Sequence, residues 1–214
     1  MQLTDATYQG IYSGRWEVGF RPYESVDFSR ACYMFSGQGT ATPGMFLSAY
    51  QQLEVVRRRF DEADGLAQSA GLPFPSLYLT DAKAIPASAL VVTRNLATYT
   101  AQVALCDHLL VTRPPPLLLT GSSQGEYAAL VCAGALEFAS LFEAIIARHR
   151  LCGPANQLGF LIAVAASPAE IASALGADRT HVSIRNSPVR SVIALAPDQR
   201  ATVEDTLRRS GIVT

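Results

Sequence analysis

The chain has 214 residues, of which 49% are apolar and 16% are charged, and its 17 basic side chains nearly cancel its 18 acidic ones. This is the composition of a globular protein that can bury a full core, and the balanced charge argues against a nucleic-acid-binding surface or a polybasic membrane face. No apolar run approaches the ~20 residues of a membrane helix, and no leader pattern opens the chain, so we expect a cytoplasmic protein without membrane contact.

The four cysteines are widely separated, at Cys32, Cys106, Cys132 and Cys152. They form no Cys-x-x-Cys pair, and no group of cysteines and histidines has metal-ligand spacing. We therefore predict no metal site, and interpret the cysteines as small core residues in a reducing compartment.

The first 30 residues show no sustained period of 2 or 3.6, and we interpret them as an N-terminal extension with a short hairpin around 10–19. The apolar run 31–35 predicts a buried strand that ends in the glycine-rich turn 36–40. Apolar residues at steps of three and four over 46–66 then predict a single amphipathic helix of about six turns.

A loop is expected over 71–86, and the helical spacing over 96–110 must end at the three prolines that follow, because proline lacks an amide donor. The apolar run 117–120 is typical of a parallel strand with both faces covered. We predict that one helix follows it to about residue 132 and that another spans 138–152.

The composition shifts at Gly153-Pro154, where a smaller unit begins. The pattern after this point predicts, in order, strand 160–166, helix 168–175, strand 181–186, strand 191–195, helix 198–209 and the start of a strand at 211. The order β-α-β-β-α-β is that of a ferredoxin-like unit. We therefore predict an α/β protein with a large subdomain over 31–154 and a small one over 155–214, whose last strand is truncated.

The pattern Gly121-x-Ser123-x-Gly125 lies between a predicted strand and a predicted helix, which is the setting of a nucleophile elbow. Glycines two residues on either side of the serine allow a sharp turn that exposes its hydroxyl group. The helix N-terminus would add positive potential where an oxyanion forms. The alternative is a tight turn in which Ser123 caps the helix.

The glycine-rich turn 36–40 lacks the spacing of a phosphate-binding loop, so we expect it to supply a backbone amide to a neighbouring site or to be an ordinary turn. Arg148 lies at the edge of the apolar stripe of the helix 138–152. An anionic ligand, a structural salt bridge or a snorkelling side chain would each explain a guanidinium there. His149, within the stripe, is interpreted as a core histidine.

Several spaced motifs together resemble the malonyl-CoA:acyl carrier protein acyltransferases, a family that includes the acyltransferase domains of polyketide and fatty-acid synthases. The segments that carry the resemblance are Phe35-Ser-Gly-Gln-Gly-Thr40, Gly121-Ser-Ser-Gln-Gly-Glu126, Arg148 and Asn186-Ser-Pro188. The resemblance extends over residues 33–214. It implies an α/β-hydrolase-like core with a parallel sheet, into which the ferredoxin-like subdomain is inserted.

The resemblance also implies site roles. Ser123 matches the nucleophile that takes the acyl group from CoA, and the backbone amides of Gln38 and Gln124 match the oxyanion hole. Arg148 matches the arginine that pairs with the malonyl carboxylate, because a guanidinium binds a carboxylate through two hydrogen bonds. No bound cofactor is implied, since CoA belongs to the substrate and phosphopantetheine to the carrier protein.

Asn95 falls where the family often has glutamine, and Asn186 falls in the small-subdomain strand that faces the site in the family. We therefore expect Asn95, Asn186 and Ser122 as candidate site-lining residues. In modular synthases, a glutamine directly after the nucleophile accompanies the use of methylmalonyl more often than malonyl, and Gln124 occupies that position here. The family usually has histidine where this chain has Ser122, and its general-base histidine lies beyond the small subdomain's last strand. We therefore expect a downstream segment or another chain to complete the fold.

The resemblance favours acyl transfer from a malonyl-type CoA (malonyl or methylmalonyl) to an acyl carrier protein in polyketide or fatty-acid biosynthesis. An editing hydrolase, in which water replaces the carrier thiol, is one alternative. A non-catalytic scaffold that binds carrier protein is another, favoured by Ser122 and the missing histidine.

Overall fold

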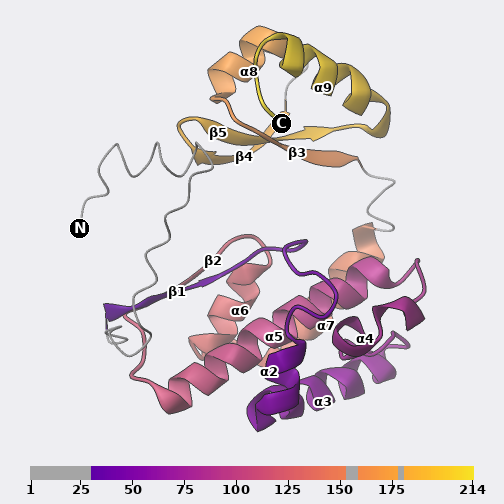
Figure 1. Ribbon diagram of the computed structural model, residues 1–214, viewed down its shortest axis with the longest axis vertical. Coiled ribbons are helices and arrows are strands. Elements are labelled where there is room, and N and C mark those ends of the chain that lie inside the picture. Colours follow the sequence, from indigo (N-terminus) through magenta and orange to yellow (C-terminus); the bar gives the residue numbers. More distant parts are fainter. Residues whose placement is uncertain (1–29, 153–158, 178–180) are drawn as a thin grey trace.

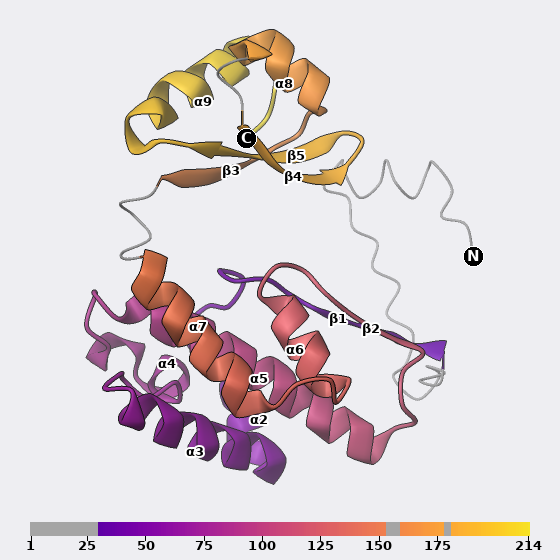
Figure 2. The same cartoon turned by 180° about the vertical axis from the view of Figure 1, so that it is seen from behind.

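The computed structural model describes residues 30–152, 159–177 and 181–214. These residues form a mixed α/β fold with a large, mainly helical subdomain (30–152) and a small subdomain (159–214), as Figures 1 and 2 show. The predicted extension, its hairpin and the boundary at Gly153-Pro154 lie outside the described residues.

The large subdomain contains a parallel pair of strands, β1 (Cys32–Phe35) and β2 (Leu118–Gly121). One face of the pair packs against α6 (Gly125–Cys132), while the other carries Met34, which is 80% exposed, and Leu118, which is 56% exposed. The prediction that 117–120 is covered on both faces was therefore wrong. Side chains alternate along a strand, and only the α6 side meets the described core.

The region 46–66 forms two helices, α2 (Leu47–Gln52) and α3 (Glu54–Ser69), where the sequence predicted one. The break is at Leu53, whose backbone is extended with φ −107° and ψ 115°. It lets α2 turn against α3, so that the Tyr50 ring contacts the Phe60 ring edge-on at 5.5 Å. No glycine or proline marks the break, because tertiary packing causes it.

The sequence predicted a loop over 71–86, but this region contains α4 (Leu77–Thr80) and the short 3₁₀ helix η3 (Ala82–Ala84). The Asp64 carboxylate accepts hydrogen bonds from the backbone amide and hydroxyl of Ser76 and so holds this region. Burial raises the pKa of Asp64, although the Ser76 hydrogen bonds act in the opposite direction.

The helix α5 (Leu90–Thr112) lies at the centre of the large subdomain, and α7 (Phe138–Cys152) packs beside it. The Tyr99 ring stacks on the Phe138 ring at 5.0 Å, and the Tyr99 hydroxyl donates to the Phe138 carbonyl. Both predicted helices are confirmed, and α5 is longer than expected at both ends.

The elements of the small subdomain are β3 (Phe160–Val164), α8 (Pro168–Leu175), β4 (His181–Ser187), β5 (Arg190–Leu195), the 3₁₀ helix η6 (Pro197–Gln199) and α9 (Arg200–Arg209). Its strands form a three-stranded antiparallel sheet in the order β3-β5-β4. Helices α8 and α9 cover one face of the sheet, and the opposite face is turned toward the large subdomain (Figure 1).

The predicted order of elements is thus found, except that no strand begins at 211. One ladder-like hydrogen bond is nevertheless present there, from the Ala165 amide to the Val213 carbonyl at 2.9 Å. The last residues of the chain therefore lie beside the end of β3.

A capping box begins α8. The Ser167 hydroxyl accepts from the Glu170 amide, and the Glu170 carboxylate accepts from the Ser167 amide.

We expect Ser167→Ala to lower the free energy of unfolding at neutral pH by about 1 kcal/mol, measured by urea denaturation. The Ser167 hydroxyl also donates to the Glu170 carboxylate at 2.7 Å, and this bond, together with the one from the Ser167 amide, lowers the pKa of Glu170. The stabilisation from these two bonds is therefore present above the ordinary pKa of glutamate and is lost as pH falls through the folded pKa. If the unfolding curves of the original protein and of Ser167→Ala lie further apart in acid than at neutral pH, this prediction is wrong.

The four cysteines are free, and Cys106 is buried and Cys132 partly buried. Cys32 and Cys152 are exposed, so the prediction of core positions was wrong for these two, which occupy the outer face of β1 and the last turn of α7. Within the described ranges, no helix is long and apolar enough to cross a membrane, and no cluster of potential ligands could hold a metal ion.

Candidate active site

The turn between β2 and α6 has the backbone geometry of a nucleophile elbow. Ser123 adopts a left-handed conformation, with φ 54°, which is costly for a residue that has a side chain. The Gly125 amide donates to the Ser122 carbonyl at 2.9 Å, and the Glu126 amide donates to the Ser123 carbonyl at 3.0 Å. The residue at the cap position of α6 is Gln124, so the interpretation of Ser123 as a capping residue was wrong.

The glycines of the motif allow three backbone segments to meet. A Cβ atom on Gly121 would lie 2.2 Å from the Gly125 carbonyl carbon, and one on Gly125 would lie 2.2 Å from the Phe35 carbonyl oxygen. Neither distance allows a side chain, because the obstructing atoms belong to the backbone. The end of β1, the elbow and α6 are therefore in direct contact.

The glycine-rich turn 36–40 lies against the elbow. The Ser122 amide donates to the Phe35 carbonyl at 3.0 Å, and a Cβ atom on Gly37 would lie 3.5 Å from the Ser123 Cβ. From α5, the Gln102 side-chain amide donates to both the carbonyl and the hydroxyl of Ser36 at 2.8 Å. Sequence reasoning assigned Gln102 no role, because only the fold brings α5 to this turn.

The backbone amides of Gln38 and Gln124 flank the elbow. Among the hydrogen bonds of the described residues, neither amide donates to another backbone carbonyl. One lies in the turn 36–40 and the other at the first turn of α6, next to Ser123. Two such N–H groups beside an exposed hydroxyl are what an oxyanion hole requires.

Arg148 is held by neutral acceptors. Its Nη2 lies 2.9 Å from the Gln38 Oε1 and 3.3 Å from the Gln124 Oε1, and its guanidinium carbon lies 5.8 Å from the centre of the Tyr127 ring. No ion pair joins Arg148 to an acidic side chain in the described parts of the chain, so the structural salt bridge considered from the sequence is not found there. The positive charge remains available to an anion.

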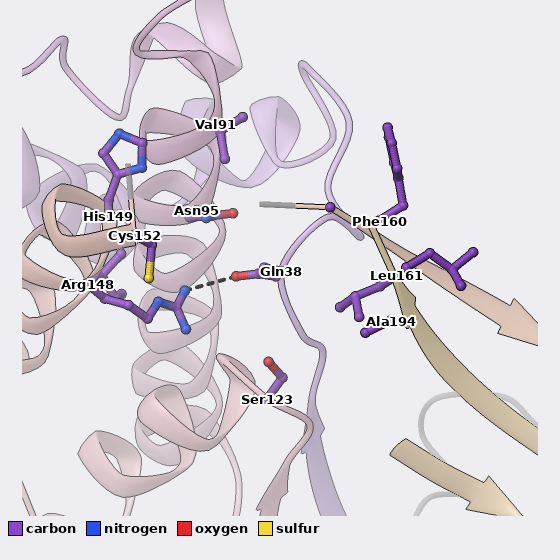
Figure 3. Close-up of a pocket in the computed structure, with 13 residues that line it drawn as sticks. Gln38, Val91, Asn95, Ser123, Arg148, His149, Cys152, Phe160, Leu161 and Ala194 are labelled. Atoms are coloured by element: carbon purple, nitrogen blue, oxygen red, sulfur yellow. Dashed lines mark hydrogen bonds between the residues drawn. The ribbon is translucent and has the colours of Figure 1, made fainter. Parts of the chain in front are cut away.

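Gln38, Ser123 and Arg148 line one cavity of about 540 Å³ between the two subdomains (Figure 3). Its polar lining includes Gln38, Asn95, Ser123, Arg148 and His149. Its apolar lining comes from α5, α7, β3 and β5 and includes Val91, Ile145, Phe160, Leu161, Ala194 and Leu195. The cavity can therefore take a ligand that has an acidic end and an apolar body.

Among the further sequence candidates, Asn95 lines the cavity and is only 6% exposed, and its Oδ1 has no hydrogen-bond partner. Asn186, on β4, and Ser122, on the elbow, are exposed and do not line it. His149 was interpreted as a core histidine but lines the cavity, as does Cys152. The lining from β3 and β5 was also missed, since no local pattern shows which sheet face meets the large subdomain.

The family model described as "Acyl transferase domain" matches residues 32–214. The chain belongs to this acyltransferase domain family. The acyltransferase domain is 30% identical over 190 residues to a non-reducing polyketide synthase of Aspergillus terreus, covering 85% of this chain and 8% of that protein. It is also 30% identical over 186 residues to the kotanin synthase of Aspergillus niger, covering 84% of this chain and 11% of the synthase.

Solved structures agree with this assignment. A loading acyltransferase from the avermectin modular polyketide synthase superposes with a TM-score of 0.76 at 21% identity, over 85% of this chain and 59% of that one. An acyl carrier protein S-malonyltransferase from Vibrio cholerae superposes with a TM-score of 0.69 at 26% identity, over 86% of this chain and 61% of that one. The acyltransferase domain thus spans about three fifths of these two solved chains and about a tenth of the two synthases.

Proposed function

We propose that the chain transfers a malonyl-type group, malonyl or methylmalonyl, from CoA to the phosphopantetheine thiol of an acyl carrier protein in polyketide or fatty-acid biosynthesis. The observation that carries the proposal is the pairing of Arg148 with two neutral carboxamides in the cavity that Ser123 also lines. A guanidinium with no acidic partner, beside a nucleophile in an elbow, fits an acyl group with a free carboxylate.

The reaction follows in two displacements. The Ser123 Oγ attacks the thioester carbonyl carbon and loses its proton, and the carbon–sulfur bond breaks as CoA leaves with a proton as a free thiol. The carrier thiol then attacks the serine ester, takes the acyl group and returns a proton to Oγ. The amides of Gln38 and Gln124 would stabilise the oxyanion of each tetrahedral intermediate. No step uses a bound cofactor.

The general base is the component that we assign to another segment. No described histidine is hydrogen-bonded to Ser123, and the family resemblance implies a histidine beyond the small subdomain's last strand. We propose that a partner segment supplies it. The outer face of β1 and β2, with exposed Met34 and Leu118, offers apolar surface for such a segment.

We also infer that the large subdomain is part of an α/β-hydrolase-like core and that the small one is ferredoxin-like. The first inference is supported by the parallel strand pair and by the left-handed Ser123 between strand and helix. The second is supported by the order β-α-β-β-α and by the antiparallel sheet covered on one face. We keep the predicted boundaries, 31–154 and 155–214, as part of this proposal.

An editing hydrolase would use the same serine ester but release it to water. Arg148 argues against this function, because an enzyme for unsubstituted acyl groups needs no carboxylate partner. A non-catalytic scaffold is favoured by Ser122, but the available amides beside an exposed Ser123 argue against it. Comparing acyl release with and without carrier protein distinguishes the hydrolase, and the absence of any serine ester identifies the scaffold.

The decisive experiment is incubation with labelled malonyl-CoA, followed by intact-mass and peptide analysis. We expect one malonyl group on the peptide that contains Ser123, and no label on the Ser123→Ala variant, because its alanine cannot form the ester. Label that persists on this variant would show that another residue is the nucleophile. A chain that stays unlabelled during prolonged incubation even when the segment that supplies the base is present would support the scaffold.

A further inference from the structure

Gln124, directly after the nucleophile, is polar yet only 1% exposed. Both ends of its carboxamide are hydrogen-bonded: Nε2 donates to the Asn95 backbone carbonyl at 2.6 Å, and Oε1 accepts from the Arg148 Nη2 at 3.3 Å. A buried carboxamide with two such partners has a fixed position, because breaking either bond would leave a polar group unsatisfied.

The orientation of this carboxamide follows from the chemistry of its two neighbours. A backbone carbonyl only accepts hydrogen bonds, so the nitrogen of Gln124 must face Asn95. A guanidinium only donates, so the oxygen of Gln124 must face Arg148. Asn95 belongs to α5, which is buried over most of its middle turns, so the chain of contacts begins at a rigid element.

The second carboxamide on Arg148 differs in its surroundings. Gln38 is exposed and lies in the turn 36–40, whereas Gln124 is enclosed and tethered to α5. Of the five N–H donors of a guanidinium, Gln38 and Gln124 occupy two, both on Nη2. Within the described ranges no side chain or carbonyl accepts from the other three donors, so a carboxylate that enters the cavity can bind there and compete with the exposed Gln38, while Gln124 keeps its hold.

We propose that Gln124 is a positioning residue that aims the Arg148 guanidinium at the free carboxylate of the acyl group. Selection of dicarboxylic over monocarboxylic acyl groups then depends on the chain of contacts from the Asn95 carbonyl through Gln124 to Arg148. This inference rests on the proposed function, and it assigns Gln124 a side-chain role separate from that of its backbone amide.

The test measures binding, so that it does not depend on turnover. The probes are malonyl and acetyl analogues of CoA in which a methylene group replaces the thioester sulfur, so that no acyl group can be transferred. Calorimetry gives the Kd of each, and the ratio of the two reports carboxylate recognition. In Gln124→Leu we expect the malonyl analogue to bind about tenfold more weakly, as for the loss of one hydrogen bond to a charged group. The acetyl analogue should bind as it does to the original protein.

Gln102→Leu is the matched control, since it removes another carboxamide near the site that contacts Ser36 and not Arg148. Any change in this variant should affect both analogues alike. If Gln124→Leu does not fold, Gln124→Glu replaces it. Its carboxylate would face the Asn95 carbonyl and pair with Arg148, so the malonyl preference should fall further.

The outcomes separate the two proposals. If Arg148→Ala loses the malonyl preference while the Gln124 variants keep it, the positioning role is wrong and the proposed function stands. If a Gln124 variant weakens both analogues equally, its role is merely structural and the inference is overturned. If Arg148→Ala itself keeps the preference, the carboxylate role of Arg148 fails, and the proposed function with it.

Discussion

Arg148→Ala is expected to slow malonyl loading of Ser123 by about 100-fold, the effect of leaving an enclosed carboxylate without its cationic partner. Loading of an acetyl group should be unchanged or faster, because acetyl makes no use of the guanidinium. The reason lies in the geometry: among the described residues, the hydrogen bonds of the Arg148 guanidinium go to the neutral oxygens of Gln38 and Gln124. The charge is therefore satisfied by hydrogen bonds but not neutralised.

The measurement is a time course of the serine ester by intact-mass spectrometry, with malonyl-CoA and acetyl-CoA in separate and competing reactions. Arg148→Lys serves as the graded control. Lysine keeps the charge but cannot form the two parallel hydrogen bonds of a guanidinium, so we expect an intermediate rate for malonyl. Equal losses for malonyl and acetyl in Arg148→Ala would show that Arg148 supports the fold and not the carboxylate.

Gly125→Ala is expected to abolish the folded state, with a loss of more than about 4 kcal/mol in the free energy of unfolding. The added Cβ would lie 2.2 Å from the Phe35 carbonyl oxygen and 2.8 Å from the Ser36 carbonyl oxygen. These are backbone atoms at the end of β1, so no side-chain rotation can relieve the clash. Either β1 or α6 would have to move, and the elbow and the turn 36–40 would separate.

Gly65→Ala is the matched control for this prediction. Gly65 lies within α3, and an added Cβ there would have no atom within 4 Å. Since alanine has a higher helix propensity than glycine, we expect the free energy of unfolding of this variant to rise by about 0.5–1 kcal/mol. Urea denaturation followed by circular dichroism compares the two variants. A Gly125→Ala protein that unfolds at the original midpoint would show that the close approach is not required.

Local sequence patterns sufficed for most elements of the fold. The apolar period predicted the helix 138–152 to the residue, and Ser167-Pro168 marked the start of α8. The same period continued across Leu53, although the helix is interrupted there between α2 and α3. The interruption allows the Tyr50 and Phe60 rings to make contact. A helical pattern of apolar residues shows which face is buried, but it does not show where the helix bends to pack against another element.

The candidate site was likewise predictable from the sequence only in part. Ser123 could be proposed as the nucleophile from the strand, the glycines and the helix around it. The edge of an apolar stripe drew attention to Arg148 but left three explanations open, and only the family resemblance favoured a carboxylate partner. The two carboxamides that hold Arg148, the Asn95 carbonyl behind Gln124, and the contact of Gln102 with Ser36 could not be predicted. Each of these joins residues far apart in the chain, and no periodicity encodes which of them will meet.

The sequence by itself determined an α/β chain with a serine between two glycines, a glycine-rich turn and an arginine on the rim of a buried helix face. These are local properties, fixed by side-chain period and backbone freedom. Only the tertiary structure decided that the turn lies against the elbow, that Arg148 has neutral partners, and that β3 and β5 close the cavity. Those facts depend on how helices and sheets pack across long chain separations, where van der Waals fit and hydrogen-bond satisfaction select one arrangement.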